Sequence, residues 1–200
     1  MPNDDIERRN FVLDSCKVES RADGESRTIV GHAAVFNELS ENLGGFRELI
    51  QPGAFKDAIE QDDVRALFNH NPDYILGRNK AGTLALSEDQ RGLAIEITPP
   101  DTQVGRDLLV SMERGDITQM SFGFRVKAGG QSWGEDENGE TIRTLTDLKL
   151  FDVSPVTYPA YPQTDAALRS MNEFKDSNGK EEQRASLQRL QPKLRLIELG

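Results

Sequence analysis

Three residues that can act together in covalent catalysis occur far apart in the chain. Ser121 lies in ITQMSFGFRV, His70 follows VRALFN, and Asp152 lies in LKLFDVSPV. Serine becomes a nucleophile when a base removes its proton, and histidine has a suitable pKa for this near neutral pH. A carboxylate can then orient the imidazole and stabilise its charged form. The three positions therefore form a candidate Ser-His-Asp site.

The stretch around Ser121 has the two-residue period of a half-buried strand. Large apolar side chains occupy one face, at Met120, Phe122 and Phe124. The other face carries Ser121 and then a glycine, where a surface strand usually carries Thr, Lys or Glu. We interpret the glycine as leaving room for a substrate backbone beside the serine.

His70 ends the predicted strand 63–69, directly before the turn sequence Asn71-Pro72-Asp73. A strand end is a rigid position for a base, and a turn leaves the ring accessible. A histidine before a turn is nevertheless more often an ordinary hydrogen-bonded loop residue, just as a serine in a strand is more often structural.

Asp152 stands in a strongly apolar run, where a carboxylate is costly to bury without a partner. His70 is one such partner, and Arg125 or Arg143 is another. The aspartate could also cap a turn through its side chain. Spacing alone therefore leaves the Ser-His-Asp interpretation open.

Composition excludes several function classes. The net charge of −10 argues against nucleic-acid binding, which needs clustered Lys and Arg. One cysteine, Cys16, and two histidines cannot form a disulfide or a usual zinc site. No nucleotide-binding or zinc-protease motif occurs, so we expect neither metal nor cofactor. No apolar run approaches the ~20 residues of a membrane span, and the polar N-terminus is unlike a signal peptide, so we expect a soluble cytoplasmic protein.

Short strands with turn signals between them dominate the predicted secondary structure. The predicted helices are 53–61 and 101–114, the second capped by Asp101 or Thr102. This pattern is typical of a β-barrel or sandwich with flanking helices. Residues 128–140 are interpreted as a long loop and 170–184 as a flexible linker. The predicted strands are 9–18, 27–36, 63–69, 82–87, 91–98, 117–127 and 142–153.

Five ordered motifs resemble the prohead proteases of tailed phages, serine peptidases of capsid maturation that are distantly similar to herpesvirus assemblins. The resemblance runs from about residue 11 to about residue 165. The motifs are GHAAVFNE, ELIQPGAFKDAI, VRALFNHNPDYILGR, GDITQMSFGFRV and LKLFDVSPVTYPAYPQT.

The resemblance implies a mainly β fold with flanking helices: a closed, mostly antiparallel β-barrel of the herpesvirus-protease type. It places the nucleophile at Ser121, the general base and acid at His70, and the group that orients His70 at Asp152, where the family usually has glutamate. His32 stands where the family commonly has an aromatic residue, and we expect it to serve core or strand packing. The oxyanion would be met by backbone amides near Phe122 and Gly123, or by Arg125, which could equally be an ordinary exposed strand residue.

The resemblance also implies a domain plan. Residues 1–10 would be an N-terminal tail, 11–165 the protease domain, and 166–200 a flexible linker and C-terminal tail removed by self-cleavage. The substrates would be a scaffolding protein or the scaffold-like N-terminal extension of the major capsid protein. Cleavage would take place in the host cytoplasm, inside the assembling prohead, and the active form could be a homodimer.

Two other functions stay open on sequence grounds. A catalytically inactive scaffold or capsid-interaction module could keep the same barrel, although such a protein would be expected to lose one of the three catalytic residues. A hydrolase of small esters is disfavoured because no G-x-S-x-G motif surrounds Ser121.

Overall fold

The structure, a computed structural model, describes residues 6–11, 16–20, 27–158, 167–177 and 180. The chain divides into two compact units, residues 1–164 and 165–200. The described part of the second unit is a helix over 167–177. The linker predicted from residue 170 is therefore wrong up to residue 177.

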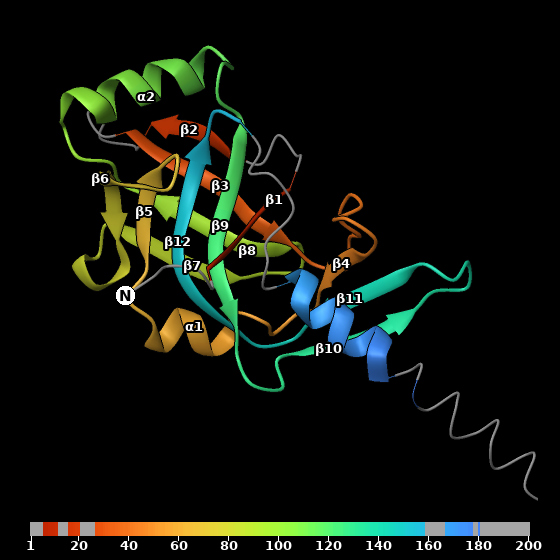
Figure 1. The fold of residues 1–200 in the computed structure, drawn as a ribbon. Helices are drawn as coiled ribbons and strands as arrows, with labels where there is room; N and C mark the ends of the chain where they lie inside the picture. The colour runs from red at the N-terminus through yellow and green to blue at the C-terminus, as the bar shows by residue number, and fades with distance from the viewer. Residues whose placement is uncertain (1–5, 12–15, 21–26, 159–166, 178–179, 181–200) are drawn as a thin grey trace, which may run out of the picture. The chain divides into compact units, whose positions relative to one another are not determined.

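The described residues of the first unit form twelve strands and two α-helices, in the order shown in Figure 1. They are β1 (Glu7–Phe11), β2 (Cys16–Ser20), β3 (Arg27–Val35), β4 (Arg47–Ile50), α1 (Lys56–Gln61), β5 (Arg65–Phe68), β6 (Asn71–Arg78), the 3-10 helix η1 (Asn79–Ala81), β7 (Leu84–Glu88), β8 (Gly92–Ile97), α2 (Gln103–Glu113), β9 (Gln119–Val126), β10 (Gln131–Glu135), β11 (Thr141–Leu145) and β12 (Leu148–Val156).

The strands form three sheets. A five-stranded sheet has the order β1-β9-β12-β5-β6, a four-stranded sheet β2-β3-β8-β7, and a three-stranded sheet β10-β11-β4. All pairs are antiparallel except β12 with β5 and β11 with β4. The expected mainly β fold with a few helices is confirmed. Within the described residues no sheet closes on itself, so the closed barrel is not confirmed.

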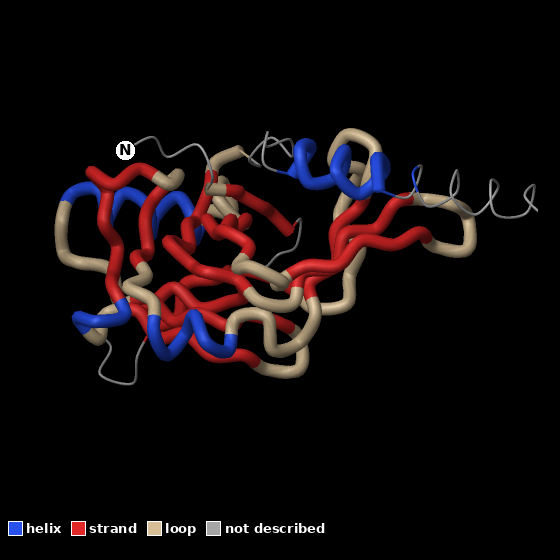
Figure 2. Tube along the Cα trace, turned by 60° about the horizontal axis from the view of Figure 1, so that its bottom comes forward, coloured by secondary structure: helices blue, strands red, loops and turns tan. Residues whose placement is uncertain are grey.

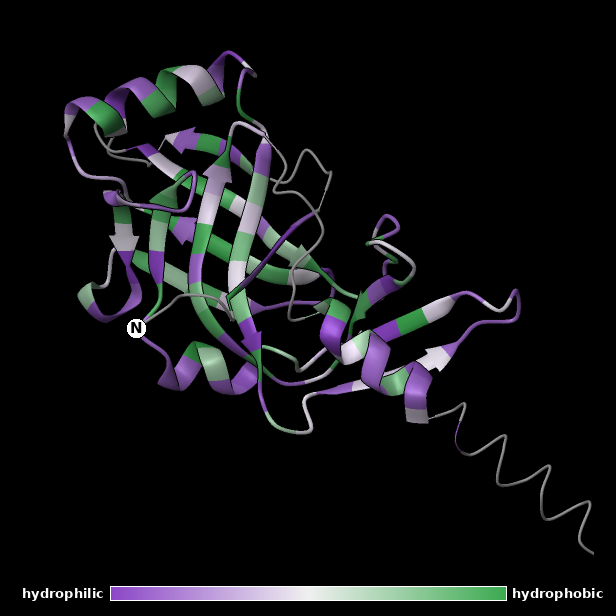
Figure 3. Ribbon diagram, in the orientation of Figure 1, coloured by the Kyte–Doolittle hydropathy of each residue, from purple (hydrophilic) through white to green (hydrophobic). Residues whose placement is uncertain are grey.

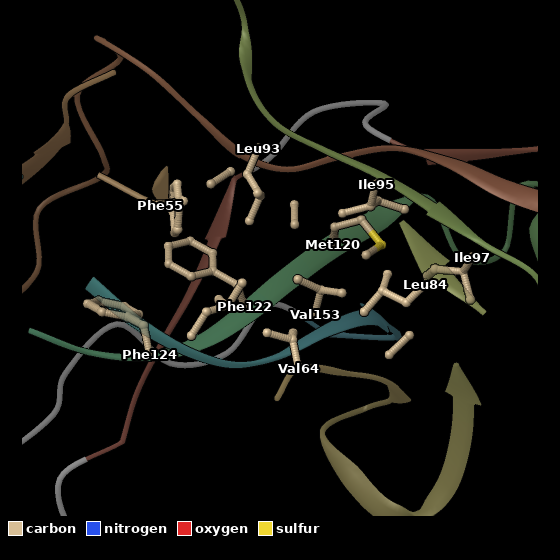
Figure 4. Packing of buried hydrophobic residues seen from close by; sticks show 14 of the residues in the cluster. Phe55, Val64, Leu84, Leu93, Ile95, Ile97, Met120, Phe122, Phe124 and Val153 are labelled. Carbon is tan, nitrogen blue, oxygen red and sulfur yellow. The ribbon is translucent and has the colours of Figure 1, made fainter. Parts of the chain in front are cut away.

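The core lies between the five-stranded and four-stranded sheets. Figure 4 shows Met120 and Val153 of the first sheet facing Ile95 and Leu84 of the second. Phe122 meets Phe55 edge to face, with ring centroids 5.5 Å apart. The strand that the alternation predicted is confirmed, and Met120, Phe122 and Phe124 are fully buried. It is not half-buried, however, because Ser121 and Gly123 on its other face are buried too.

Both predicted helices are present. α2 begins after Thr102, whose hydroxyl accepts a hydrogen bond from the Gly105 amide at 3.2 Å, and ends before Gly115, which has a φ of +81°. Leu108, Leu109 and Met112 form its buried face, and Figure 3 shows apolar and polar residues alternating along it. α2 packs against β2, whereas α1 packs against β12 and β7.

Three segments differ from the prediction. The polar stretch 128–140 contains β10, which pairs with β11 in a hairpin that extends away from the two larger sheets (Figure 2). The predicted strand 9–18 is two strands, β1 and β2, which belong to different sheets. β1 begins at Glu7, inside the predicted N-terminal tail.

No helix in the described part of the chain is long and apolar enough to span a bilayer.

Candidate active site

The structure brings Ser121, His70 and Asp152 together on one face of the five-stranded sheet. His70 Nε2 lies 2.7 Å from Ser121 Oγ, and His70 Nδ1 lies 2.5 Å from Asp152 Oδ1. An ionised carboxylate only accepts hydrogen bonds, so Nδ1 carries the proton and Nε2 is left to accept from the serine hydroxyl. This is the tautomer that a general base for Ser121 requires.

The three groups are shielded from water. Ser121 has no exposed surface, and the side chains of His70 and Asp152 are 8% and 10% exposed. Hydrogen bonds between such groups are stronger in these surroundings than in water.

A two-residue turn between β5 and β6 positions His70. Phe68 pairs with Asn71, and the two residues between them, Asn69 and His70, both have a φ of +55°. Positive φ at both central positions is typical of a type I′ turn, whose second central residue is normally glycine. The histidine therefore occupies a strained backbone conformation, which fixes the direction of its ring.

Asn69 anchors this turn to the end of β12. Asn69 Nδ2 donates to Thr157 Oγ1 at 3.1 Å, and Asn69 Oδ1 accepts from the backbone N–H of Thr157 at 2.8 Å. The backbone N–H of Asn69 donates to the backbone carbonyl of Pro155 at 3.0 Å. The turn is thereby tied to the strand that carries Asp152.

Asn69→Ala is expected to lower the free energy of unfolding by about 1–3 kcal/mol, since alanine is disfavoured at positive φ and the Thr157 bonds are lost. We expect kcat to fall more than KM rises, because the base is displaced rather than the substrate. Denaturant unfolding and steady-state kinetics measure both. Asn69→Gly accepts the same φ and should recover part of the stability; equal behaviour of the two variants would contradict the turn assignment.

Asp152 is held by a second hydrogen bond as well as by the histidine. Ser154, two residues along β12 on the same face, donates from its hydroxyl to Asp152 Oδ1 at 2.7 Å. A register shift between Leu150 and Asp152 lets Asp152 lie opposite Gly123 and Ser154 lie opposite Ser121. The irregularity thus sets which side chains of β12 lie opposite those of the strand that carries Ser121.

Gly123 is required by the carboxylate that lies over it. A Cβ built on Gly123 would overlap Asp152 Oδ2. The space that the sequence suggested for a substrate backbone is therefore filled by the carboxylate of the site itself.

Gly123→Ala is expected to displace Asp152 and to lower kcat/KM about 10²-fold, the effect of a misplacement of roughly 1 Å. Hydrolysis rates of purified protein test this. Gly134→Ala in β10 is a matched control, because a Cβ there has no atom within 4 Å. A Gly123→Ala variant as active as the Gly134→Ala variant would show that Asp152 tolerates the shift.

The structure does not place Phe122, Gly123 or Arg125 as the sequence suggested for groups that meet an oxyanion. The Phe122 side chain points into the core. β1 and β12 pair with β9 on either side at Phe122 and Gly123, so the backbone of β9 faces a neighbouring strand on both sides there. Arg125 is four residues, about 13 Å, along the strand from Ser121. Its guanidinium lies 5.6 Å from the ring centroid of Phe151. The structure does not bring Arg125 to the site.

A buried cluster of four charges holds β1 in place. It lies on the face of the five-stranded sheet opposite to Ser121, His70 and Asp152. Arg9 Nε donates to Glu48 Oε1 at 2.9 Å, and Arg143 donates to both Glu7 and Glu48 at 2.7–2.9 Å. Every one of the four side chains is at most 3% exposed. Burial by itself raises the pKa of Glu7, but the hydrogen bonds and charges of Arg143 and Arg9 outweigh it, so its pKa is lowered.

The remaining titratable residues named from the sequence lie elsewhere. His32 Nε2 is 2.8 Å from Asp89 Oδ2. This bond, with those from the amides of Gly92 and Arg91, lowers the pKa of Asp89 to about 2. Arg143 belongs to the four-charge cluster and does not contact Asp152. In the part of the chain that the structure describes, no group of three or more His, Cys, Asp or Glu residues is placed to hold a metal ion.

Sequence reasoning did not identify Asn69 and Ser154 as residues that support the site, and it did not predict the buried four-charge cluster. The signal for Asn69 was present, since FNHN can be interpreted as a two-residue turn between the strands VRALF and NPDYILGR. Ser154 follows Asp152 at the two-residue spacing of a strand face. Nothing in the sequence pairs Glu7 with Arg143, 136 positions away, or Arg9 with Glu48, 39 positions away.

Comparison with known proteins gives a family match. The model of the caudovirus prohead serine protease family matches residues 14–177. Among solved structures, the bacteriophage T4 capsid assembly protease aligns with 76% of this chain and 96% of its own, at 11% identity and a TM-score of 0.48. No curated protein sequence matched.

Proposed function

Because the chain belongs to the family of caudovirus prohead serine proteases, we propose that it cleaves capsid-assembly proteins through Ser121, His70 and Asp152. The substrates would be a scaffolding protein or the scaffold-like N-terminal extension of the major capsid protein, inside the assembling prohead. The observation that carries the proposal is the position of His70, within hydrogen-bond distance of both the serine and the aspartate.

The first half of the reaction acylates the enzyme. His70 Nε2 takes the proton from Ser121 Oγ as that oxygen attacks the peptide carbonyl carbon, and the carbonyl oxygen becomes an oxyanion. Nε2 then gives this proton to the leaving amine, the C–N bond breaks, and an acyl ester remains on Ser121. Asp152 holds the proton on Nδ1 and stabilises the imidazolium formed in between.

The second half releases the acyl group. His70 Nε2 takes a proton from water as the water oxygen attacks the ester carbon, and returns it to Ser121 Oγ as the ester bond breaks. Ser121 has no exposed surface, so a substrate segment reaches its hydroxyl only after the atoms that cover this residue have moved. A segment of capsid protein without fixed structure suits such a site better than a folded surface does.

Co-expression with the capsid protein encoded by the same phage tests the proposal. A shorter capsid-protein band is expected with the wild type and not with Ser121→Ala or His70→Ala. The intact mass of the purified protein reports self-cleavage beyond residue 165 in the same samples. An unchanged capsid band with a folded wild-type protein would favour the inactive capsid-interaction module.

A further inference from the structure

Two side chains beside Ser121 have buried amide atoms without a hydrogen-bond partner. In the described part of the chain, buried polar side-chain atoms that make no hydrogen bond occur on Asn10, Gln119 and Arg47. Both polar atoms of Asn10 and the carbonyl oxygen of Gln119 are affected. Three of these four atoms thus belong to two residues next to the proposed nucleophile.

The sheet register places both residues on the face of Ser121. Asn10 of β1 is the direct partner of Ser121 across the strand pair. Directly opposed residues of an antiparallel pair point to the same face, with Cβ atoms about 4.5–5.5 Å apart. Gln119 precedes Ser121 by two residues on the same strand, a separation of about 7 Å on the same face.

A buried amide that makes no hydrogen bond carries a desolvation penalty that nothing offsets. Buried polar side-chain atoms in proteins almost always have partners, so two such residues beside one hydroxyl need an explanation. A ligand with its own polar groups would supply the missing partners. A peptide carbonyl undergoing attack at Ser121 is a ligand of this kind.

β1 holds Asn10 in a fixed position. Residues alternate between faces along a strand. Glu7 and Arg9 therefore point into the buried four-charge cluster, whereas Asn10 points to the other face, that of Ser121. A donor fixed in advance stabilises developing charge without reorganising during the reaction.

We propose that Asn10 is a catalytic residue, whose side-chain Nδ2–H donates to the oxyanion formed when Ser121 attacks a peptide carbonyl. This assignment rests on the proposed protease function. It fills a role for which the backbone of β9 is poorly suited, because the strand is paired on both sides at Phe122 and Gly123.

The test is the rate at which a fluorophosphonate labels Ser121, since the phosphoryl oxygen of this probe occupies the oxyanion position and no natural substrate is needed. Asn10→Ala is expected to lower the second-order labelling rate about 10²–10³-fold, the usual effect of losing one oxyanion donor. Its urea unfolding midpoint should stay at or above the wild-type value, because no hydrogen bond is lost. Arg8→Ala, an exposed neighbour on the same strand and face, is the matched control and should label at the wild-type rate.

Each outcome decides the question. Slow labelling of Asn10→Ala with an unchanged or raised unfolding midpoint supports the assignment. Labelling within a few-fold of wild type overturns it and leaves the protease proposal intact. A fall in both labelling rate and midpoint also overturns it, because the amide would then be structural. A folded wild-type protein that is not labelled at Ser121 at all overturns the proposed function itself.

Discussion

Ser121→Ala is expected to lower the rate of peptide-bond hydrolysis about 10⁶-fold, the scale of loss when the nucleophile of a serine protease is removed. The hydroxyl that His70 contacts at 2.7 Å is the only group placed to form the acyl-enzyme in the described site. The measurement is the cleavage rate of a capsid-protein segment by purified protein, with fluorophosphonate labelling as a second readout.

The chain offers a matched control for this variant. Ser154 is also fully buried and lies directly opposite Ser121, but its hydroxyl bonds to Asp152 and not to His70. Ser154→Ala should therefore lose one hydrogen bond to the carboxylate and slow the reaction only about tenfold. If Ser154→Ala were as inactive as Ser121→Ala, the choice of nucleophile would be wrong.

The four-charge cluster gives the largest expected effect on stability. Arg143→Met leaves Glu7 and Glu48 buried with Arg9 as their one remaining partner in the cluster. Removing one member of a buried ion pair costs about 3–5 kcal/mol, because an uncompensated charge stays behind. We expect a loss of this size in the free energy of unfolding, measured by urea denaturation, and a parallel loss of activity as β1 detaches.

An exposed ion pair provides the comparison. Arg106 contacts Asp101 at 2.6 Å, with side chains 48% and 90% exposed. Arg106→Met should cost at most about 1 kcal/mol, the usual value for a surface pair. Similar losses for Arg143→Met and Arg106→Met would mean that burial does not set the strength of the cluster.

The same cluster makes stability depend on acid. The pKa of Glu7 is lower in the folded than in the unfolded chain, so its contribution is fully present above the unfolded value of 4.5 and is lost as pH falls through the folded value. The free energy of unfolding of the wild type should therefore fall below pH 4.5 more steeply than that of Glu7→Gln. Equal slopes for the two proteins would contradict this.

Sequence reasoning found the elements whose pattern depends on the core. The alternation around Ser121 predicted β9, and the cap residue Thr102 and terminal Gly115 predicted α2, because burial of one face dictates both patterns. Pairing Ser121 with His70 and Asp152 rested on family resemblance, since local pattern does not specify which distant strands become neighbours.

The errors have identifiable physical reasons. Pro72 suggested a turn, but β6 is an edge strand, where a proline leaves no sheet hydrogen bond unmade. Residues 170–177 seemed to belong to a linker because they are polar, yet Ala167, Met171 and Phe174 have helical spacing. The first residues of β1 fell in the predicted tail 1–10, and the charged residues Glu7 and Arg9 gave no sign of burial. Their partners lie on β4 and β11, and the sequence does not reveal such long-range pairs.

The position of β1 has a consequence for when activity can arise during synthesis. β9, the strand that carries Ser121, pairs with residues 7–11 on one side and 148–156 on the other, so its neighbours come from opposite ends of the first unit. Contacts of such long sequence separation form late and make folding slow. A nascent chain that has not yet reached Asp152 lacks both a complete sheet and the carboxylate that contacts His70. We therefore expect proteolytic activity only from a chain in which both neighbours of β9 have been synthesised.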